Sequence, residues 1–219
     1  MIALDTTALS LLFVPNAKSS TKDGAQIKHA KERMDLLVER IAREQDAILI
    51  PTPSLSEVLI KLEPVKIDEL LKRLKASPWF RVESFDSAAA VELASRTAKA
   101  IQAKDKWEGL KADHTKIKFD RQIVSVAIVN GATEIISDDE DVDAIGKRWG
   151  IQVTSVKDLP LPAAFIPPPI YQFLENDETQ KAQSEPTQVR GSSVGLPEGE
   201  AGTKALSASV RQDTEGEKS

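Results

Sequence analysis

The chain has 219 residues, of which 41% are hydrophobic, 29% are charged and 5% are aromatic, and its formal net charge is −5. The absence of cysteine excludes a disulfide scaffold, a thiolate zinc site, a thiol nucleophile and an iron–sulfur cluster. No apolar run approaches the roughly 18 residues that a membrane span needs, and the N-terminus lacks the pattern of a secretion signal. The composition therefore predicts a soluble, cytoplasmic protein with no membrane partner.

The C-terminal part of the chain differs in composition from the rest. Residues 175–219 are mostly Glu, Gln, Ser, Thr, Gly and Lys, and they cannot bury enough apolar surface to offset the loss of chain entropy on folding. Before them lies the proline-rich sequence LPLPAAFIPPP, which cannot continue a helix. We therefore predict a folded domain over 1–158, a linker over 159–174 and a disordered acidic tail over 175–219.

Within the predicted domain, short apolar runs alternate with stretches of helical periodicity. Strands are predicted at 2–5, 47–51, 79–85, 133–136 and 151–156. Helices are predicted at 6–13, 27–45, 54–62, 67–74, 87–103, 119–130 and 142–149. Strands that alternate with helices in this way form right-handed βαβ units. The sequence therefore predicts an α/β fold in three layers (α/β/α) around a mostly parallel central sheet.

Finer patterns predict several local features. Ser54 and Glu57 have the spacing of a capping box, which would place Ser54 at a helix N-cap and Glu57 in the first turn. The buried stripe of the helix over 87–103 is predicted to consist of Val91, Ala94, Ala98 and Ile101. Residues 104–118 are expected to be irregular, so that Asp120 opens the next helix.

Four carboxylates fall where predicted strands end or predicted helices begin. They are Asp5, Glu57, Asp120 and Asp139. Ligands of an open parallel sheet bind outside the carboxyl ends of its strands. Carboxylates gathered there raise each other's pKa, and a hard divalent cation with oxygen ligands, Mg²⁺ or Mn²⁺, removes that penalty. Such a site can activate a water for hydrolysis of a phosphodiester bond.

The motifs around these acids resemble those of the PIN-domain nucleases, and most closely the VapC-type toxin ribonucleases. The matching stretches are Asp5-Thr6-Thr7-Ala8-Leu9, PTPSLSEVLI around Glu57, FDRQIVSVAIVNGATEIIS around Asp120, and SDDED at 137–141. The resemblance covers residues 2–158. It implies a PIN-like fold and a Mg²⁺- or Mn²⁺-dependent endoribonuclease in which the four acids hold the metal and carry the catalysis.

The fourth motif offers several acids, and the third departs from the family. Asp138, Asp139 and Asp141 compete for the fourth position; the register favours Asp139, and Asp141 is a candidate fifth ligand acting through a water. Small residues usually follow the third acid in the family, whereas Arg121 and Gln122 follow it here. This substitution places a basic group beside the predicted site.

Further residues are candidates for contact with the substrate. Lys118 or Arg121 would steady the scissile phosphate, with a solvated loop as the plain alternative for this basic stretch. Thr6 and Ser137 would hydrogen-bond a carboxylate or a water at the metal, or they are ordinary helix caps. Trp107 would stack on a base or pack against the domain.

Three classes of function remain open on the sequence. The first is an endoribonuclease; by the resemblance it would be the toxin of a toxin–antitoxin pair, blocked by an antitoxin and forming a homodimer. The second is a catalytically weak PIN-like scaffold that binds RNA or protein. The third is a phosphatase or receiver-type domain, which ranks last because Thr7 stands where the phosphatase motif D-x-D-x-T has its second acid. Four acids in order favour the enzyme, because a scaffold does not need them.

Overall fold

The structure is a computed structural model that describes residues 1–21, 23–105, 110 and 113–165. The predicted tail over 175–219, most of the predicted linker and Trp107 lie outside the described residues. The predicted domain over 1–158 lies almost entirely within them.

Five strands form one sheet in the described part of the chain. They are β1 (Ile2–Leu4), β2 (Ile48–Pro51), β3 (Phe80–Glu83), β4 (Glu134–Ile136) and β5 (Gln152–Thr154). Their order is β3-β2-β1-β4-β5, and the pairings between these neighbours are parallel. The chain leaves β1 in one direction to build β2 and β3 and later returns to its other side to build β4 and β5. The strand order therefore reverses between β1 and β4, where an open α/β sheet forms a crevice.

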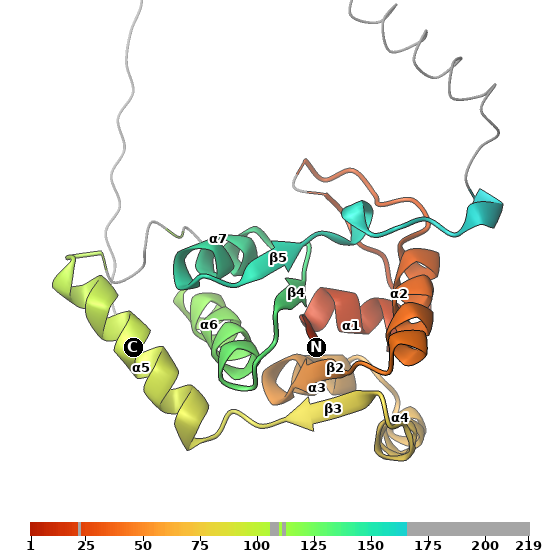
Figure 1. The fold of residues 1–219 in the computed structure, drawn as a ribbon, viewed down its shortest axis with the longest axis horizontal. Helices are drawn as coiled ribbons and strands as arrows, with labels where there is room; N and C mark the ends of the chain where they lie inside the picture. Colours follow the sequence, from red (N-terminus) through yellow and green to blue (C-terminus); the bar gives the residue numbers. More distant parts are fainter. Residues whose placement is uncertain (22, 106–109, 111–112, 166–219) are drawn as a thin grey trace, which may run out of the picture. The chain divides into compact units, whose positions relative to one another are not determined.

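Helices cover both faces of this sheet (Figure 1). The helices before β3 are α1 (Thr6–Phe13), α2 (Ala30–Glu44), α3 (Thr52–Ile60) and α4 (Pro64–Ala76). Those after β3 are α5 (Ser87–Gln102), α6 (His114–Val129) and α7 (Glu140–Trp149). Two 3₁₀ turns, η1 (Val156–Asp158) and η2 (Ala163–Phe165), follow β5.

The strands divide their side chains between two apolar clusters. Leu4 and Ile50 belong to a cluster with α1 to α4. The residues directly before them in the same strands, Ala3 and Leu49, belong to a cluster with α5 to α7. Successive side chains of a strand point to opposite faces, so a strand buried on both faces is apolar throughout. The predicted three-layer α/β/α architecture with a parallel sheet is thus confirmed.

The predicted start of α3 is wrong. The helix begins at Thr52 with Pro51 as its N-cap, so Ser54 lies inside the helix and is buried. Pro53 fits the first turn because the N–H that proline lacks would have no partner within the helix there. Glu57 consequently lies in the second turn and takes no part in a capping box.

The predicted inward face of α5 is also wrong. Val91 is 69% exposed and Ile101 is 53% exposed, while Ala89 and Ala100 are buried. The true inward face includes Arg96, whose guanidinium lies 6.0 Å from the centre of the Trp149 ring on α7. The inward face of α5 therefore combines Ala89 and Ala100 with Leu93, which packs against the cluster of α6 and α7, and differs from the predicted stripe.

Helix α6 begins earlier than the sequence predicts. Asp113 is its N-cap and accepts a hydrogen bond from the backbone N–H of Thr115 at 2.8 Å. Ile117 is fully buried and anchors this added turn. Residues 114–118 are therefore helical rather than irregular, and Asp120 lies in the second turn instead of opening the helix.

In the part of the chain that the structure describes, no helix is both long enough and apolar enough to cross a membrane.

Candidate active site

Asp5 and Ser137, which follow the adjacent strands β1 and β4, form the buried base of the candidate site. Asp5 follows β1 and caps α1, its Oδ1 accepting a hydrogen bond from the backbone N–H of Ala8 at 2.7 Å. Ser137 follows β4, and its hydroxyl donates to Asp5 Oδ2. Both residues are almost completely buried, with Asp5 2% exposed. The carboxyl ends of β1 and β4, where the strand order reverses, therefore fix the first carboxylate in one orientation.

A cavity of about 280 Å³ opens at this point, and we call it the acidic cavity. The four acids singled out from the sequence all line it: Asp5, Glu57, Asp120 and Asp139. Its other lining residues are Thr6, Thr7, Lys61, Lys116, Ile123 and Val142. The fold thus brings together four carboxylates that are spread over more than half of the predicted domain.

Two acids of the cavity, Asp120 and Asp139, form a tighter group with Asp141, and we call these three residues the acidic triad. Asp120 on α6, Asp139 at the N-cap of α7 and Asp141 in the first turn of α7 each offer a carboxylate oxygen, and these oxygens lie within 4.8 Å of one another. The backbone N–H of Asp141 donates to Asp139 Oδ1 at 2.8 Å, which orients the Asp139 side chain. A group of carboxylates at this separation could hold a metal ion.

Lys116 sits against the acidic triad. Its Nζ lies 3.2 Å from Asp120 Oδ2, 2.8 Å from Asp139 Oδ2 and 2.6 Å from Asp141 Oδ2. Burial alone would lower the pKa of Lys116, but its hydrogen bonds with Asp139 and Asp141 outweigh that effect and raise the pKa above its usual value. The ammonium is therefore held in its charged form by the carboxylates.

Burial dominates the ionisation of two acids in the cavity. It raises the pKa of Asp5 to about 7, although the hydrogen bonds from Ser137 and Ala8 act in the opposite direction. It raises the pKa of Asp120 to about 6, where the charge of Lys116 lowers the value and that of Asp139 raises it. Both carboxyls are thus costly to ionise in this structure, and additional positive charge would stabilise their ionised forms.

The donor set fits a hard divalent ion. The acids that line the cavity offer carboxylate oxygens, and neither cysteine nor histidine lines it. The Oγ1 atom of Thr6 is buried and has no hydrogen-bond partner among the described residues, although Thr6 lines the cavity. Oxygen donors with room for retained waters match the preferences of Mg²⁺ and Mn²⁺. The residues present therefore suit the kind of ion expected from the sequence.

Asp138 faces a different environment from its neighbour Asp139. Its carboxylate accepts hydrogen bonds from the hydroxyls of Ser19 and Ser155 and from the backbone N–H of Val156, the last at 2.9 Å. These bonds tie the segment before α2 and the segment after β5 to the end of β4. Asp138 does not line the acidic cavity, and this geometry favours Asp139 as the acid that faces it.

The residues predicted to contact substrate lie in different surroundings. Ser137 is buried, donates to Asp5 and accepts from the backbone N–H of Asp139 at 3.0 Å, so it positions two acids. Arg121 is only 3% exposed and points into the interior, and Lys118 is exposed; the lining of the acidic cavity includes neither. Thr6 does line the cavity.

Two cations line the cavity: Lys61, which was not predicted, and Lys116, which belongs to the basic stretch 111–121 that was predicted to contact phosphates. Lys61, one helical turn after Glu57, lines the cavity, and its Nζ donates to Ser10 Oγ at 3.1 Å. Lys116 lies one turn before Asp120. Each lysine is four residues from an acid, a spacing that brings side chains together on a helix. For Lys61, the C-cap of α3, this spacing from Glu57 could have been recognised within the predicted helix.

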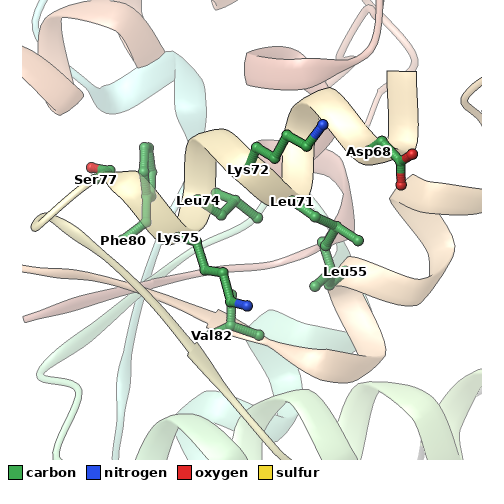
Figure 2. A pocket seen from close by; sticks show the side chains of 9 residues that line it. All are labelled: Leu55, Asp68, Leu71, Lys72, Leu74, Lys75, Ser77, Phe80 and Val82. Atoms are coloured by element: carbon green, nitrogen blue, oxygen red, sulfur yellow. The ribbon is translucent and has the colours of Figure 1, made fainter. Parts of the chain in front are cut away.

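A larger groove of about 530 Å³ lies between α3, α4 and β3, and we call it the apolar groove. Figure 2 shows the side chains that line it, which are Leu55, Asp68, Leu71, Lys72, Leu74, Lys75, Ser77, Phe80 and Val82. Its floor is mostly aliphatic and aromatic, and it contains none of the acids of the acidic cavity. The larger of the two hollows is therefore not the one with reactive side chains.

Comparison with known proteins gives structural neighbours at low sequence identity. No protein-family profile and no curated protein sequence matches the chain. The chain is similar to a chain in the crystal structure of VapBC2 from Rickettsia felis bound to a DNA fragment from their promoter, with a TM-score of 0.45 and 15% identity over 71% of this chain and 98% of that one. It is also similar to a chain in the crystal structure of DNA-bound VapBC from Salmonella typhimurium, with a TM-score of 0.42 and 15% identity over 71% of this chain and 97% of that one.

Proposed function

We propose that the protein is a metal-dependent endoribonuclease that hydrolyses RNA phosphodiester bonds at the acidic cavity. The observation that carries this proposal is the acidic triad, whose carboxylate oxygens lie within 4.8 Å of one another. Two of its members, Asp120 and Asp139, line one cavity with Asp5 and Glu57. The motif resemblance of residues 2–158 to PIN-domain nucleases supports RNA as the substrate.

The acids would hold one or two Mg²⁺ or Mn²⁺ ions. Asp120, Asp139 and Asp141 would supply the ligands of the triad, and Asp5 and Glu57 would supply further oxygens from the same cavity. A divalent ion bound there lowers the pKa of a water and stabilises the charge that develops on the leaving oxygen.

The chain's own side chains prepare this site in two ways. Ser137 and the backbone N–H of Ala8 fix both oxygens of Asp5, so its carboxylate does not have to reorient during the reaction. Lys61 and Lys116 line the cavity and supply positive charge for a phosphate of the substrate. Lys118, exposed on α6, would extend this basic surface to the neighbouring phosphates.

The resemblance also supports a role as the toxin of a toxin–antitoxin pair. In that role an antitoxin would cover the acidic cavity, and the protein would form a homodimer. The alternative is a catalytically weak scaffold that binds RNA or protein. The observation that favours the scaffold is Lys116, because its ammonium contacts all three acids of the triad and partly neutralises them.

Cleavage of RNA by the purified full-length protein tests the proposal. A mixed RNA pool is incubated with Mg²⁺, with Mn²⁺ and with EDTA, beside the Asp120→Asn variant and an Asp35→Asn control. Asp35 is an exposed acid of α2 paired with Lys31, so its loss leaves the cavity unchanged. We expect metal-dependent cleavage that falls by about 100-fold or more in Asp120→Asn, because even changes to groups around the ligands cost 10- to 100-fold. Equal cleavage by all three proteins would refute the enzyme, since a contaminating nuclease would not depend on Asp120.

A further inference from the structure

Lys116 fills the position that a metal ion would take at the acidic triad. Its Nζ lies within 3.2 Å of one carboxylate oxygen of each triad residue. An ion bound by these carboxylates needs the same oxygens and would be repelled by an ammonium beside them. The ammonium and a divalent ion therefore cannot both occupy the centre of the triad.

The side chain of Lys116 can leave without disturbing the fold. Its backbone is held in α6, where the next residue, Ile117, is fully buried. The Lys116 side chain itself is 43% exposed, and its flexible stem carries a strongly hydrated charge. Withdrawal of the ammonium into solvent exchanges three ion pairs for water and requires no movement of the helix.

Lys116 does not satisfy every buried polar group of the cavity. The three donors of an ammonium match the three carboxylates of the triad, yet the buried Oγ1 of Thr6 in the same cavity has no partner among the described residues. Divalent ions such as Mg²⁺ retain several waters, which could hydrogen-bond to such a hydroxyl. The cavity is thus better matched to a hydrated ion than to the ammonium alone.

We infer that Lys116 is an intramolecular counter-cation that a divalent ion displaces, so that this side chain sets the metal affinity of the site. The inference rests on the proposed function in one respect, because it requires the triad to bind a metal. Without the ion, Lys116 neutralises the acids. With the ion bound, its ammonium is released to the rim of the cavity, where a phosphate of the substrate is expected.

Titration of the full-length protein with Mn²⁺ tests the competition. The proteins compared are the native chain, Lys116→Gln and the matched control Lys31→Gln. Lys31 also pairs with an acid four residues away, Asp35 at 2.7 Å, but on α2 and outside the cavity. We expect Lys116→Gln to bind Mn²⁺ about tenfold more tightly, because a competing charge in direct contact is removed. Lys31→Gln should bind like the native chain, and a Lys116→Gln protein that binds no more tightly would overturn the inference.

Chemical labelling of the native protein gives a second readout that needs no variant. Acetylation of each lysine is followed by peptide mass spectrometry in EDTA and in saturating Mg²⁺. Lys116 should react slowly in EDTA, because its ammonium is held charged by three acids, and about tenfold faster once the ion displaces it. The labelling rate of Lys31 should not change. A Lys116 rate that is the same in EDTA and Mg²⁺ would contradict displacement, even if Lys116→Gln failed to fold.

The two experiments separate the inference from the proposal beneath it. If none of the proteins binds Mn²⁺, the metal site and the inference both fail. If native protein and Lys116→Gln bind Mn²⁺ with equal affinity and Lys116 labelling is unchanged by Mg²⁺, the metal site stands and the displacement by metal is refuted.

Discussion

The acidic cavity, beyond the carboxyl ends of β1 and β4, differs from the apolar groove beside β3 in the chemistry of its walls. The cavity contains two carboxyls whose burial makes them costly to ionise, with the pKa of Asp5 raised to about 7 and that of Asp120 to about 6. The groove is walled by residues such as Leu74 and Phe80 and has no comparable group. Burial of the groove's side chains stabilises the fold, whereas burial of the cavity's acids opposes it. A region that reduces stability in this way is a better candidate for function than a larger hollow that does not.

The largest effect on the free energy of unfolding should come from replacing Asp5, the most deeply buried acid of the cavity. An acid whose pKa is higher in the folded than in the unfolded protein binds protons more tightly when folded, so the free energy of unfolding falls as the pH rises. For Asp5 this fall extends from its usual pKa of 3.8 to about 7. In EDTA, Asp5→Asn should therefore be more stable than the native protein at pH 8, by about 4 kcal/mol at most, and the difference should vanish below pH 4.

Urea denaturation of both proteins from pH 4 to pH 8 measures this difference. Asparagine is also a good N-cap, so the cap of α1 is retained in the variant. Asp35→Asn serves as the control, because Asp35 is exposed and paired on the surface of α2. The same pH dependence in Asp5→Asn and in the native protein would show that burial of Asp5 does not oppose folding.

Replacing a buried side chain of the apolar groove should lower the stability of the protein, in contrast to replacing Asp5. Leu74 is buried at its wall, so Leu74→Ala should lower the free energy of unfolding by about 3 kcal/mol, from lost burial and the space left behind. Because neither leucine nor alanine ionises and Asp68, the acid of the groove, is exposed, we expect the same loss at pH 5 and pH 8 and no change in Mn²⁺ affinity. Denaturation at the two pH values and a metal titration check this, and a loss that depends on pH would tie the groove to the acids.

A smaller loss of stability should follow from replacing Asp138, which lies next to Asp139 but outside the acidic cavity. Asp138 links three segments through Ser19, Ser155 and the backbone of Val156. Asp138→Ala should therefore cost about 2 kcal/mol of stability, since buried donors lose their partner. Thermal unfolding measures this cost. An unchanged melting temperature would mean that these hydrogen bonds contribute nothing to the fold.

The convergence of the acids was predictable from the sequence. Asp5 and Asp139 follow apolar runs that could only be buried parallel strands, and the carboxyl ends of such strands meet at one edge of the sheet. Glu57 and Asp120 were predicted from their places near the starts of helices, and the fold places both in the same cavity although each helix begins earlier than predicted. Their chemical roles remain predictions.

Other features could not be predicted because they depend on tertiary packing. On α5 the stripe with Val91 and Ile101 is exposed, because the face that packs against the cluster of α6 and α7 is the one with Ala89, Leu93 and Ala100. The position of Lys116 was missed for a related reason. Its segment has no clear periodicity, and only the cap at Asp113 extends α6 far enough to bring Lys116 one turn before Asp120.

The most direct test of the central claim is a metal titration that compares two neighbouring positions. Asp139→Asn and Asp138→Asn remove one carboxylate each, one residue apart, but only Asp139 belongs to the acidic triad. We expect Asp139→Asn to weaken Mn²⁺ binding by about 10- to 100-fold and Asp138→Asn to leave it nearly unchanged. Native affinity in Asp139→Asn, or an equal loss in both variants, would contradict a metal site at the triad.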